Sequence, residues 1–268
     1  MSVVLQTKNL TKSFGRKVAV DRVSMTIYKG DIYGFIGRNG AGKTTFMRTV
    51  LSLARPDSGE IVLFEGEPRK TAGRRIGSLI EAPGLYPQCT ALENLKRFGQ
   101  LYGFEQVDYE GILKEVGLED QIHKKAGHFS LGQKQRMGIA IALLGEPELM
   151  VLDEPINGLD PAGIKDIRDL ILRLNQEKGI TFLISSHLLD ELSKIVTRYG
   201  IINQGRLVEE VSTAELANRQ GTSVQVRVSS PEDAARLHAL LRMNGYAEED
   251  LEIHSVDMEQ YFLERIGR

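Results

Sequence analysis

Residues 37–44 read Gly37-Arg38-Asn39-Gly40-Ala41-Gly42-Lys43-Thr44, which fits the pattern G-x-x-x-x-G-K-[ST]. The apolar block 32–36 before this stretch predicts a strand, and helical spacing through Leu53 predicts a helix after it. Glycines let successive backbone amides turn toward a phosphate, which the helix N-terminus also attracts. The alternative is a glycine-rich turn that binds nothing. The order strand, loop, helix favours a nucleotide-binding loop.

Three side chains at the end of this loop have expected roles. Lys43 should contact the β- and γ-phosphates of the nucleotide. Thr44 should offer its hydroxyl to Mg²⁺, which also takes phosphate oxygens and water as ligands. Thr45, the next residue, is included among the cofactor-binding candidates.

Two carboxylates follow an apolar segment later in the chain. Residues 149–152 read as a buried parallel strand, and Asp153 and Glu154 come directly after it. Ligands bind at the carboxyl edge of such sheets. We expect Asp153 to hold Mg²⁺ through its water shell and Glu154 to orient or deprotonate the water that attacks the γ-phosphate. Taken alone, the pair could equally be two solvated residues that close a strand.

His187 stands at the end of another predicted strand, 180–184. An imidazole at this edge can reach a γ-phosphate, so His187 is a second catalytic candidate. A residue that starts a helix is the alternative for a lone histidine. Between these strands, Asp160-Pro161 predicts the start of a helix with one apolar face that ends at Gly179.

The middle of the chain, residues 83–145, has mostly helical spacing and predicts an inserted helical subdomain. Thr90 and Glu93 have the spacing of a capping box, and so do Ser130 and Gln133. Local capping fully explains Ser130 and Gln133. A second interpretation is that the helix N-terminus at Gly132 presents bare amides to an anion in another subunit.

The two ends of the chain read differently. Alternating apolar residues in 3–10 and 23–27 predict an antiparallel start, and 61–64 predicts a further strand. We expect an α/β fold with a nucleotide-binding core in residues 1–220. Residues 221–268 predict a small α+β appendage, with alternation in 224–228, a helix from Ser230-Pro231, a short strand 251–253 and a closing helix.

Composition limits the function classes. The 268 residues carry 34 Lys plus Arg against 36 Asp plus Glu, a balance that argues against a nucleic-acid partner. Cys89 is the one cysteine, which excludes an intrachain disulfide and a cysteine-based zinc site. Uncharged stretches are too short to span a bilayer and the first residues lack a basic leader, so we expect a cytosolic protein.

Residues 3–216 resemble the ATP-binding subunits of ABC transporters, in motif order and in spacing. The resemblance places the Walker A loop at 37–44, the signature motif at 129–133 (FSLGQ), Walker B at 149–154 and the D-loop at 157–160. His187 is similar to the family's switch histidine, and Phe14 to the aromatic residue that stacks on adenine. An ordinary hydrophobic residue in a turn is the alternative for Phe14.

The resemblance implies a P-loop NTPase fold, with a mixed central sheet, an antiparallel β subdomain and the helical subdomain. It also implies a head-to-tail homodimer that hydrolyses ATP with Mg²⁺. Ser130, Gly132 and Gln133 would then act on the partner's nucleotide, and Asp160 would organise the interface. A separate transmembrane permease would hold the chain at the cytoplasmic face of the membrane, docked through the helical subdomain and Glu81.

Two residues depart from the family pattern. Leu131 stands where the signature usually has glycine, while Ser130 and Gly132 are retained. Glu81 stands where the family normally has the Q-loop glutamine, and we include it among the metal candidates because a carboxylate adds charge beside Mg²⁺. A residue that merely flanks a flexible hinge is the alternative for Glu81.

Several features resemble the lantibiotic and bacitracin immunity or export branch of the family. They are Glu81, the segment 83–87, the stretch TALENL at 90–95 and the tail 258–264. The expected function is therefore to power export of, or immunity to, a peptide antibiotic. A non-transport ABC-type ATPase acting on ribosomes or DNA is the alternative, although the chain has one motif set and no long heptad insert. A P-loop phosphotransferase is disfavoured by the signature and D-loop.

Overall fold

The computed structural model describes residues 2–220 and 230–244. The chain divides into two compact units, Met1–Gln220 and Gly221–Arg268. The strands are β1 (Val3–Phe14), β2 (Lys17–Tyr28), β3 (Ile32–Ile36), β4 (Ser58–Leu63), β5 (Ile76–Leu79), β6 (Leu149–Asp153), β7 (Thr181–Ser186), β8 (Arg198–Asn203) and β9 (Arg206–Ser212).

Most of the helices follow or separate these strands. The α-helices are α1 (Lys43–Val50), α2 (Arg69–Ala72), α3 (Ala91–Tyr102), α4 (Tyr109–Glu115), α5 (Leu131–Leu143), α6 (Pro161–Lys178), α7 (Leu189–Leu192), α8 (Thr213–Gln220) and α9 (Pro231–Met243). Short 3₁₀ turns lie at η1 (Phe64–Gly66), η2 (Gly73–Arg75), η3 (Glu119–Gln121) and η4 (Ala126–His128).

Within the described residues the strands form two sheets. A three-stranded sheet has the order β2-β1-β4, with antiparallel pairing throughout. A six-stranded sheet has the order β5-β6-β7-β3-β8-β9. Across this sheet, each neighbouring pair in the series β5, β6, β7, β3 and β8 is parallel, and β9 runs antiparallel to β8. The fold class expected from the sequence, α/β with a mixed central sheet and an antiparallel subdomain, is therefore confirmed.

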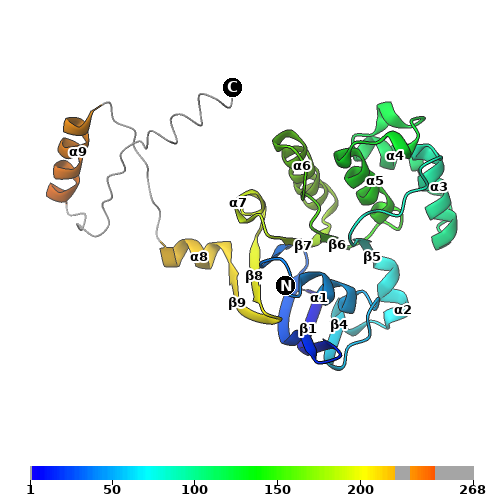
Figure 1. The fold of residues 1–268 in the computed structure, drawn as a ribbon, viewed down its shortest axis with the longest axis horizontal. Helices are drawn as coiled ribbons and strands as arrows, with labels where there is room; N and C mark the ends of the chain where they lie inside the picture. Colours follow the sequence, from blue (N-terminus) through cyan, green and yellow to red (C-terminus); the bar gives the residue numbers. More distant parts are fainter. Residues whose placement is uncertain (1, 221–229, 245–268) are drawn as a thin grey trace. The chain divides into compact units, whose positions relative to one another are not determined.

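The two faces of the central sheet belong to two separate cores. Side chains alternate between faces along a strand, so Leu149 and Val151 of β6 join a core with β1, β2 and α1. Met150 and Leu152 join the other core, which contains α3, α5 and α6. This alternation places α1 between the two sheets and α3, α5 and α6 on the opposite face of the central sheet (Figure 1).

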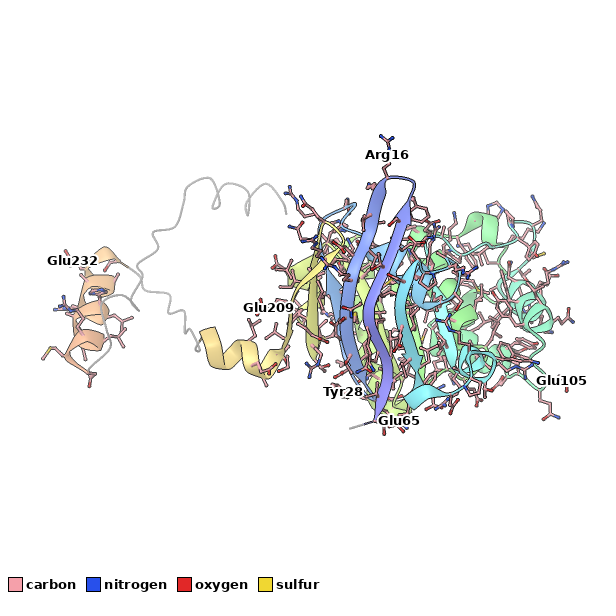
Figure 2. The ribbon with its side chains drawn as sticks, turned by 90° about the horizontal axis from the view of Figure 1, so that it is seen from below. Arg16, Tyr28, Glu65, Glu105, Glu209 and Glu232 are labelled. Atoms are coloured by element: carbon pink, nitrogen blue, oxygen red, sulfur yellow. The ribbon has the colours of Figure 1, made fainter. Side chains whose placement is uncertain are left out.

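The antiparallel sheet extends well beyond its apolar segments. Strands β1 and β2 form a long hairpin, with Phe14 paired to Lys17 and Arg16 at the tip (Figure 2). The predicted strands 3–10 and 23–27 were therefore too short. Exposed ends of a hairpin need no apolar alternation, because backbone pairing alone continues them.

Both predicted capping boxes are formed in the helical region between β5 and β6. Thr90 Oγ1 accepts from the amide of Glu93 at 3.2 Å, and the Glu93 carboxylate accepts from the amide of Thr90 at 2.7 Å. Ser130 and Gln133 make the same reciprocal pair at the start of α5. Figure 1 shows α3, α4 and α5 grouped together beside α6.

Other expectations differ from the structure in detail. Helix α1 ends at Val50 and not at Leu53, because the chain turns through Ser52, which has a φ of 63°. The predicted helix start at Ser230 is confirmed by α9, where Ser230 Oγ accepts from the amide of Asp233 at 3.1 Å. The expected strands at 224–228 and 251–253 and the closing helix lie outside the described residues.

Candidate nucleotide-binding site

The loop between β3 and α1 requires glycine at two of its positions. Gly42 has a φ of 112°, and a Cβ at this position would lie 2.3 Å from the carbonyl oxygen of Ala19. A Cβ on Gly37 would lie 2.4 Å from the carbonyl oxygen of Ile202. Any other residue would push the loop off its neighbours. The glycines therefore hold the backbone in place ahead of the first amides of α1, which can face an anion.

The other loop residues are also placed by the structure. Arg38, Asn39 and Gly40 are exposed, and Ala41 is buried, with its amide donating to the carbonyl oxygen of Arg38 at 3.0 Å. Thr45, on the first turn of α1, accepts a hydrogen bond at its carbonyl oxygen from the hydroxyl of Thr49.

Lys43 is buried at the base of the loop, with a relative exposure of 6%. Its Nζ donates to the carbonyl oxygen of Gly37 at 2.6 Å and lies 3.1 Å from Glu154 Oε1. The ammonium is thus fixed between the loop backbone and the carboxylate that follows β6. A cation held in this way is positioned to pair with phosphate oxygens.

Asp153, at the end of β6, accepts hydrogen bonds from two hydroxyl groups. Thr44 Oγ1 donates to its Oδ2 at 2.7 Å, and Ser185 Oγ donates to its Oδ1 at 2.5 Å. Ser185 also accepts from the amide of Glu154 at 2.9 Å. Ser185 was not among our predicted site residues. The sequence carries no signal for this bond, because only the register of the parallel neighbours β6 and β7 pairs Asp153 with Ser185.

The donor atoms around Thr44 suit a magnesium ion. A hydroxyl and a buried carboxylate meet at the carboxyl edge of the sheet, and Mg²⁺ prefers such oxygens together with phosphate and water. Within residues 2–220 and 230–244, no cluster of three or more His, Cys, Asp or Glu side chains forms a metal site by itself.

Glu154 and His187 lie together, as their positions at two strand ends predict. His187 Nδ1 is 2.8 Å from Glu154 Oε2. Glu154 has a φ of 50°, so the chain leaves β6 in a left-handed conformation that turns away from the strand direction. Its side chain is 20% exposed, while its Oε1 atom is buried.

Glu81 is engaged by a different partner. Its Oε1 lies 2.7 Å from Arg48 Nη2, and both side chains are exposed. Arg48 is one helical turn after Thr44, on the same face of α1. One face of α1 thus contacts the ends of two neighbouring strands. Thr44 bonds to Asp153 at the end of β6, and Arg48 pairs with Glu81 after β5. Glu81 is not joined to Thr44 or Asp153 by a hydrogen bond.

Other predicted site residues stand in separate local settings. The side chains of Ser130 and Gln133 cap α5, and Gln133 Oε1 also accepts from Lys124 Nζ at 3.0 Å. Asp160 caps α6 by accepting from the amide of Gly163 at 2.8 Å. Phe14 is 56% exposed near the hairpin tip, with Lys12 Nζ 5.2 Å from the ring centroid.

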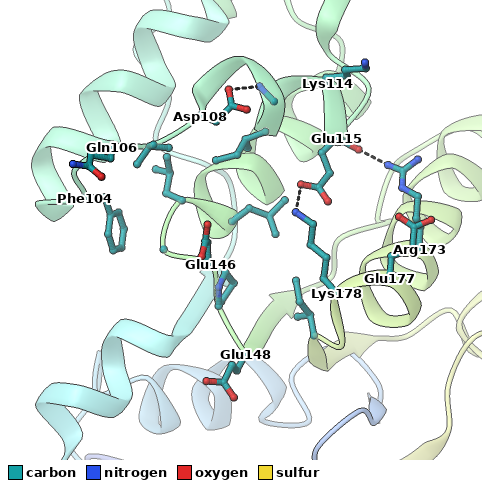
Figure 3. A pocket seen from close by; sticks show the side chains of 18 of the residues that line it. Phe104, Gln106, Asp108, Lys114, Glu115, Glu146, Glu148, Arg173, Glu177 and Lys178 are labelled. Carbon is teal, nitrogen blue, oxygen red and sulfur yellow. Dashed lines mark hydrogen bonds and ion pairs between the residues drawn. The ribbon is translucent and has the colours of Figure 1, made fainter.

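A cavity of about 1240 Å³ lies elsewhere, among α4, the end of α6 and residues 143–148 (Figure 3). Lys178 Nζ lies 2.6 Å from the Glu115 carboxylate across it, and Arg173 donates to the Glu115 carbonyl oxygen. None of the predicted site residues lines this cavity. Its lining carries charges of both signs, among them the paired Lys178 and Glu115.

The fold and the loop geometry define a P-loop nucleotide-binding protein. The family model described as "ABC transporter" matches residues 20–157. The bacitracin transport ATP-binding protein BcrA of Bacillus licheniformis is 43% identical, over 97% of this chain and 83% of the relative. This chain belongs to the ABC transporter family, as one of its ATP-hydrolysing subunits. The resemblance found in the sequence is confirmed.

Two further relatives add detail. The lantibiotic transport ATP-binding protein SrtF of Streptococcus pyogenes is 41% identical, over 77% of this chain and 90% of the relative. A solved dimeric ATP-binding cassette in a post-hydrolysis state, bound to ADP and phosphate, has a TM-score of 0.67 and 26% identity. It matches 78% of this chain and 98% of that cassette.

Across residues 2–220 and 230–244, no helix combines the length and the apolarity of a membrane span.

Proposed function

We propose that this chain powers a transporter that exports, or gives immunity to, a peptide antibiotic of the bacitracin or lantibiotic kind. One observation carries the ATPase half of the proposal. Two consecutive residues of the phosphate loop each contact one of two consecutive carboxylates at the end of β6. Lys43 Nζ lies 3.1 Å from Glu154, and Thr44 donates to Asp153 at 2.7 Å. The names of BcrA and SrtF support the cargo class.

The chemistry assigned to the site is ATP hydrolysis. Lys43 pairs with the β- and γ-phosphates, while Thr44 and Asp153 would hold Mg²⁺, which neutralises phosphate charge when bound. Glu154 orients a water and accepts its proton as the oxygen bonds to the γ-phosphorus. The bond from that phosphorus to the bridging oxygen of ADP breaks, and ADP leaves with the electron pair. His187, held by Glu154, supports the transferred phosphoryl group.

We assign the remaining candidates to a head-to-tail homodimer with two nucleotides. Ser130, Gly132 and Gln133 would contact the partner's ATP through the start of α5, since a helix N-terminus attracts phosphate. Asp160 would organise the interface, and Phe14 would stack on adenine. The exposure of Ser130 and Phe14 and the dimeric state of the solved cassette support this arrangement.

The proposed partner is a separate transmembrane permease, which would hold the chain at the cytoplasmic face of the membrane. We place its docking surface on the helical region and Glu81. A row of rings runs through Tyr86, Phe98, Tyr102 and Phe104, with successive centroids 6.1, 5.9 and 6.1 Å apart. Tyr86 and Tyr102 are 46% and 51% exposed, which supports contact with an apolar partner.

The test is affinity purification of the tagged chain from its native cells in mild detergent, with mass spectrometry of stoichiometric partners. The proposal predicts one multi-span membrane protein, and Tyr102→Ala should reduce its recovery while the exposed control Leu53→Ala should not. Recovery of ribosomal or DNA-repair proteins instead, with the chain absent from the membrane fraction, would favour the non-transport ATPase.

A further inference from the structure

Leu131, the residue that departs from the usual signature glycine, lies against Gly158 of the loop after β6. A Cβ built on Gly158 would lie only 3.2 Å from Leu131 Cδ2, and Gly158 has a φ of 73°. Position 158 is therefore restricted twice, by backbone conformation and by the leucine above it. The leucine is accommodated because position 158 is a glycine.

A reciprocal contact lies beside the first. A Cβ built on Gly132 would have Leu159 Cδ2 as its neighbour, at 3.8 Å. Each of the two motifs thus places a leucine over a glycine of the other. We call these two contacts, Leu131 over Gly158 and Leu159 over Gly132, the interlock. Leu159 is also partly buried against the core that contains α5 and α6.

The loop that carries Gly158 is itself held by short-range hydrogen bonds. The amide of Asn157 donates to the Glu154 carbonyl oxygen at 3.1 Å, and the amide of Leu159 donates to the Ile156 carbonyl oxygen at 3.4 Å. Asp160 then caps α6. The interlock therefore connects the start of α5 to a braced loop that begins at Glu154.

We infer that Leu131 is a positioning residue that joins the signature turn and the D-loop of one subunit into a single preformed surface for a second copy of this chain. The inference rests on the proposed function. Ordering two loops on binding costs conformational entropy, so loops that are already joined bind a partner more tightly. A leucine supplies the contact here that a glycine at 131 lacks.

Leu131→Ala tests the interlock with little risk to the fold. Leu131 is 46% exposed and opens α5, where alanine favours the helix and leaves the Ser130–Gln133 cap unchanged. Hydrogen exchange of the full nucleotide-free chain should be at least about threefold faster in residues 156–160. The control is Leu101→Ala, on an exposed leucine of α3, and it should leave this segment unchanged. Leu131→Met, which restores the reach of the side chain, should restore protection.

The functional part is measured by ATP-dependent dimerisation in the Glu154→Gln background. Leu131→Ala should weaken the dimer by at least about threefold, with ATP affinity of the monomer and the melting temperature unchanged. Leu131→Met should recover the dimer.

Three results would count against the account. Unchanged exchange in 156–160 would overturn the interlock, and faster exchange with an unchanged dimer would overturn its role in positioning. If the Glu154→Gln protein with Leu131 intact formed no dimer, that result would contradict the proposed function. Hydrogen exchange in residues 156–160 would still test the interlock independently.

Discussion

His187 Nδ1 lies 2.8 Å from Glu154 Oε2, and Glu154 Oε1 lies 3.1 Å from Lys43 Nζ. One carboxylate therefore connects a residue of the phosphate loop to the histidine after β7. Because β6 and β7 are parallel neighbours, Glu154 and His187 leave the sheet at the same edge. These two contacts fix the orientation of the Glu154 carboxylate.

His187→Ala should lower the rate of ATP hydrolysis by about a hundredfold or more, because Glu154 loses the partner that orients it. ATP affinity should stay near that of the unchanged protein, since the phosphate loop is intact. Phosphate release under saturating ATP measures the first effect and calorimetry the second. His123→Ala, at an exposed histidine of the helical region, is the control. Equal rates for the two variants would remove His187 from the mechanism.

Lys43→Ala should weaken ATP binding by at least about a hundredfold, because a buried ammonium that pairs with phosphate is lost. Isothermal calorimetry with MgATP makes the measurement. Lys165→Ala, at an exposed lysine of α6, should bind ATP normally. Unchanged affinity in Lys43→Ala would refute the assignment of the phosphate loop.

The Arg48–Glu81 pair predicts a change in magnesium dependence. Arg48→Gln leaves the Glu81 charge uncompensated at the same sheet edge as Asp153, so half-maximal hydrolysis should need about twofold to threefold less Mg²⁺. Glu81→Gln leaves the Arg48 charge uncompensated and should shift the requirement the other way, and the double variant, which lacks both charges, should resemble the unchanged protein. Superimposable titrations of all three would reduce Glu81 to a residue that flanks a hinge.

Burial raises the pKa of Glu210 above its ordinary value of 4.5, although its Oε1 accepts hydrogen bonds from the amide of Thr26 and the hydroxyl of Tyr33. The folded chain then keeps a proton that the unfolded chain has released. This contribution to stability is therefore lost as the pH rises from 4.5 through the raised pKa. Relative to the unchanged protein, Glu210→Gln should gain free energy of unfolding across that window.

Urea denaturation at a series of pH values from about 4 to about 8 measures the difference. Glu60→Gln, at an exposed glutamate of β4, is the control for the substitution itself. A pH-independent difference for Glu210→Gln would contradict the assignment of a raised pKa.

Features that depend on residues close together in the sequence were predicted well. Thr90 with Glu93 and Ser130 with Gln133 form their capping boxes because each pair spans a single helical turn. The parallel strands around Asp153 could be expected from continuous apolar runs. In contrast, the hairpin β8–β9 was missed, because β9 buries only Val211 fully and its apolar alternation is weak.

Features that depend on pairing between segments far apart in the chain could not be predicted from the sequence. Ser185 bonds to Asp153 only because the register of β6 and β7 aligns them. The contacts of Arg48 with Glu81 and of Leu131 with Gly158 join segments whose sequences carry no shared pattern. Both contacts involve a residue at which this chain departs from the family motif, Glu81 and Leu131.

Sedimentation of Glu154→Gln in excess MgATP tests the central claim most directly. The variant keeps Lys43, Thr44 and Asp153, so it should bind ATP but fail to hydrolyse it, because the amide accepts no proton from water. We expect a species of twice the protomer mass that disappears when ATP is withdrawn. Glu177→Gln, at an exposed glutamate of α6, should hydrolyse ATP and accumulate no such dimer. A Glu154→Gln protein that binds MgATP and remains entirely monomeric would contradict an ATP site shared between two copies.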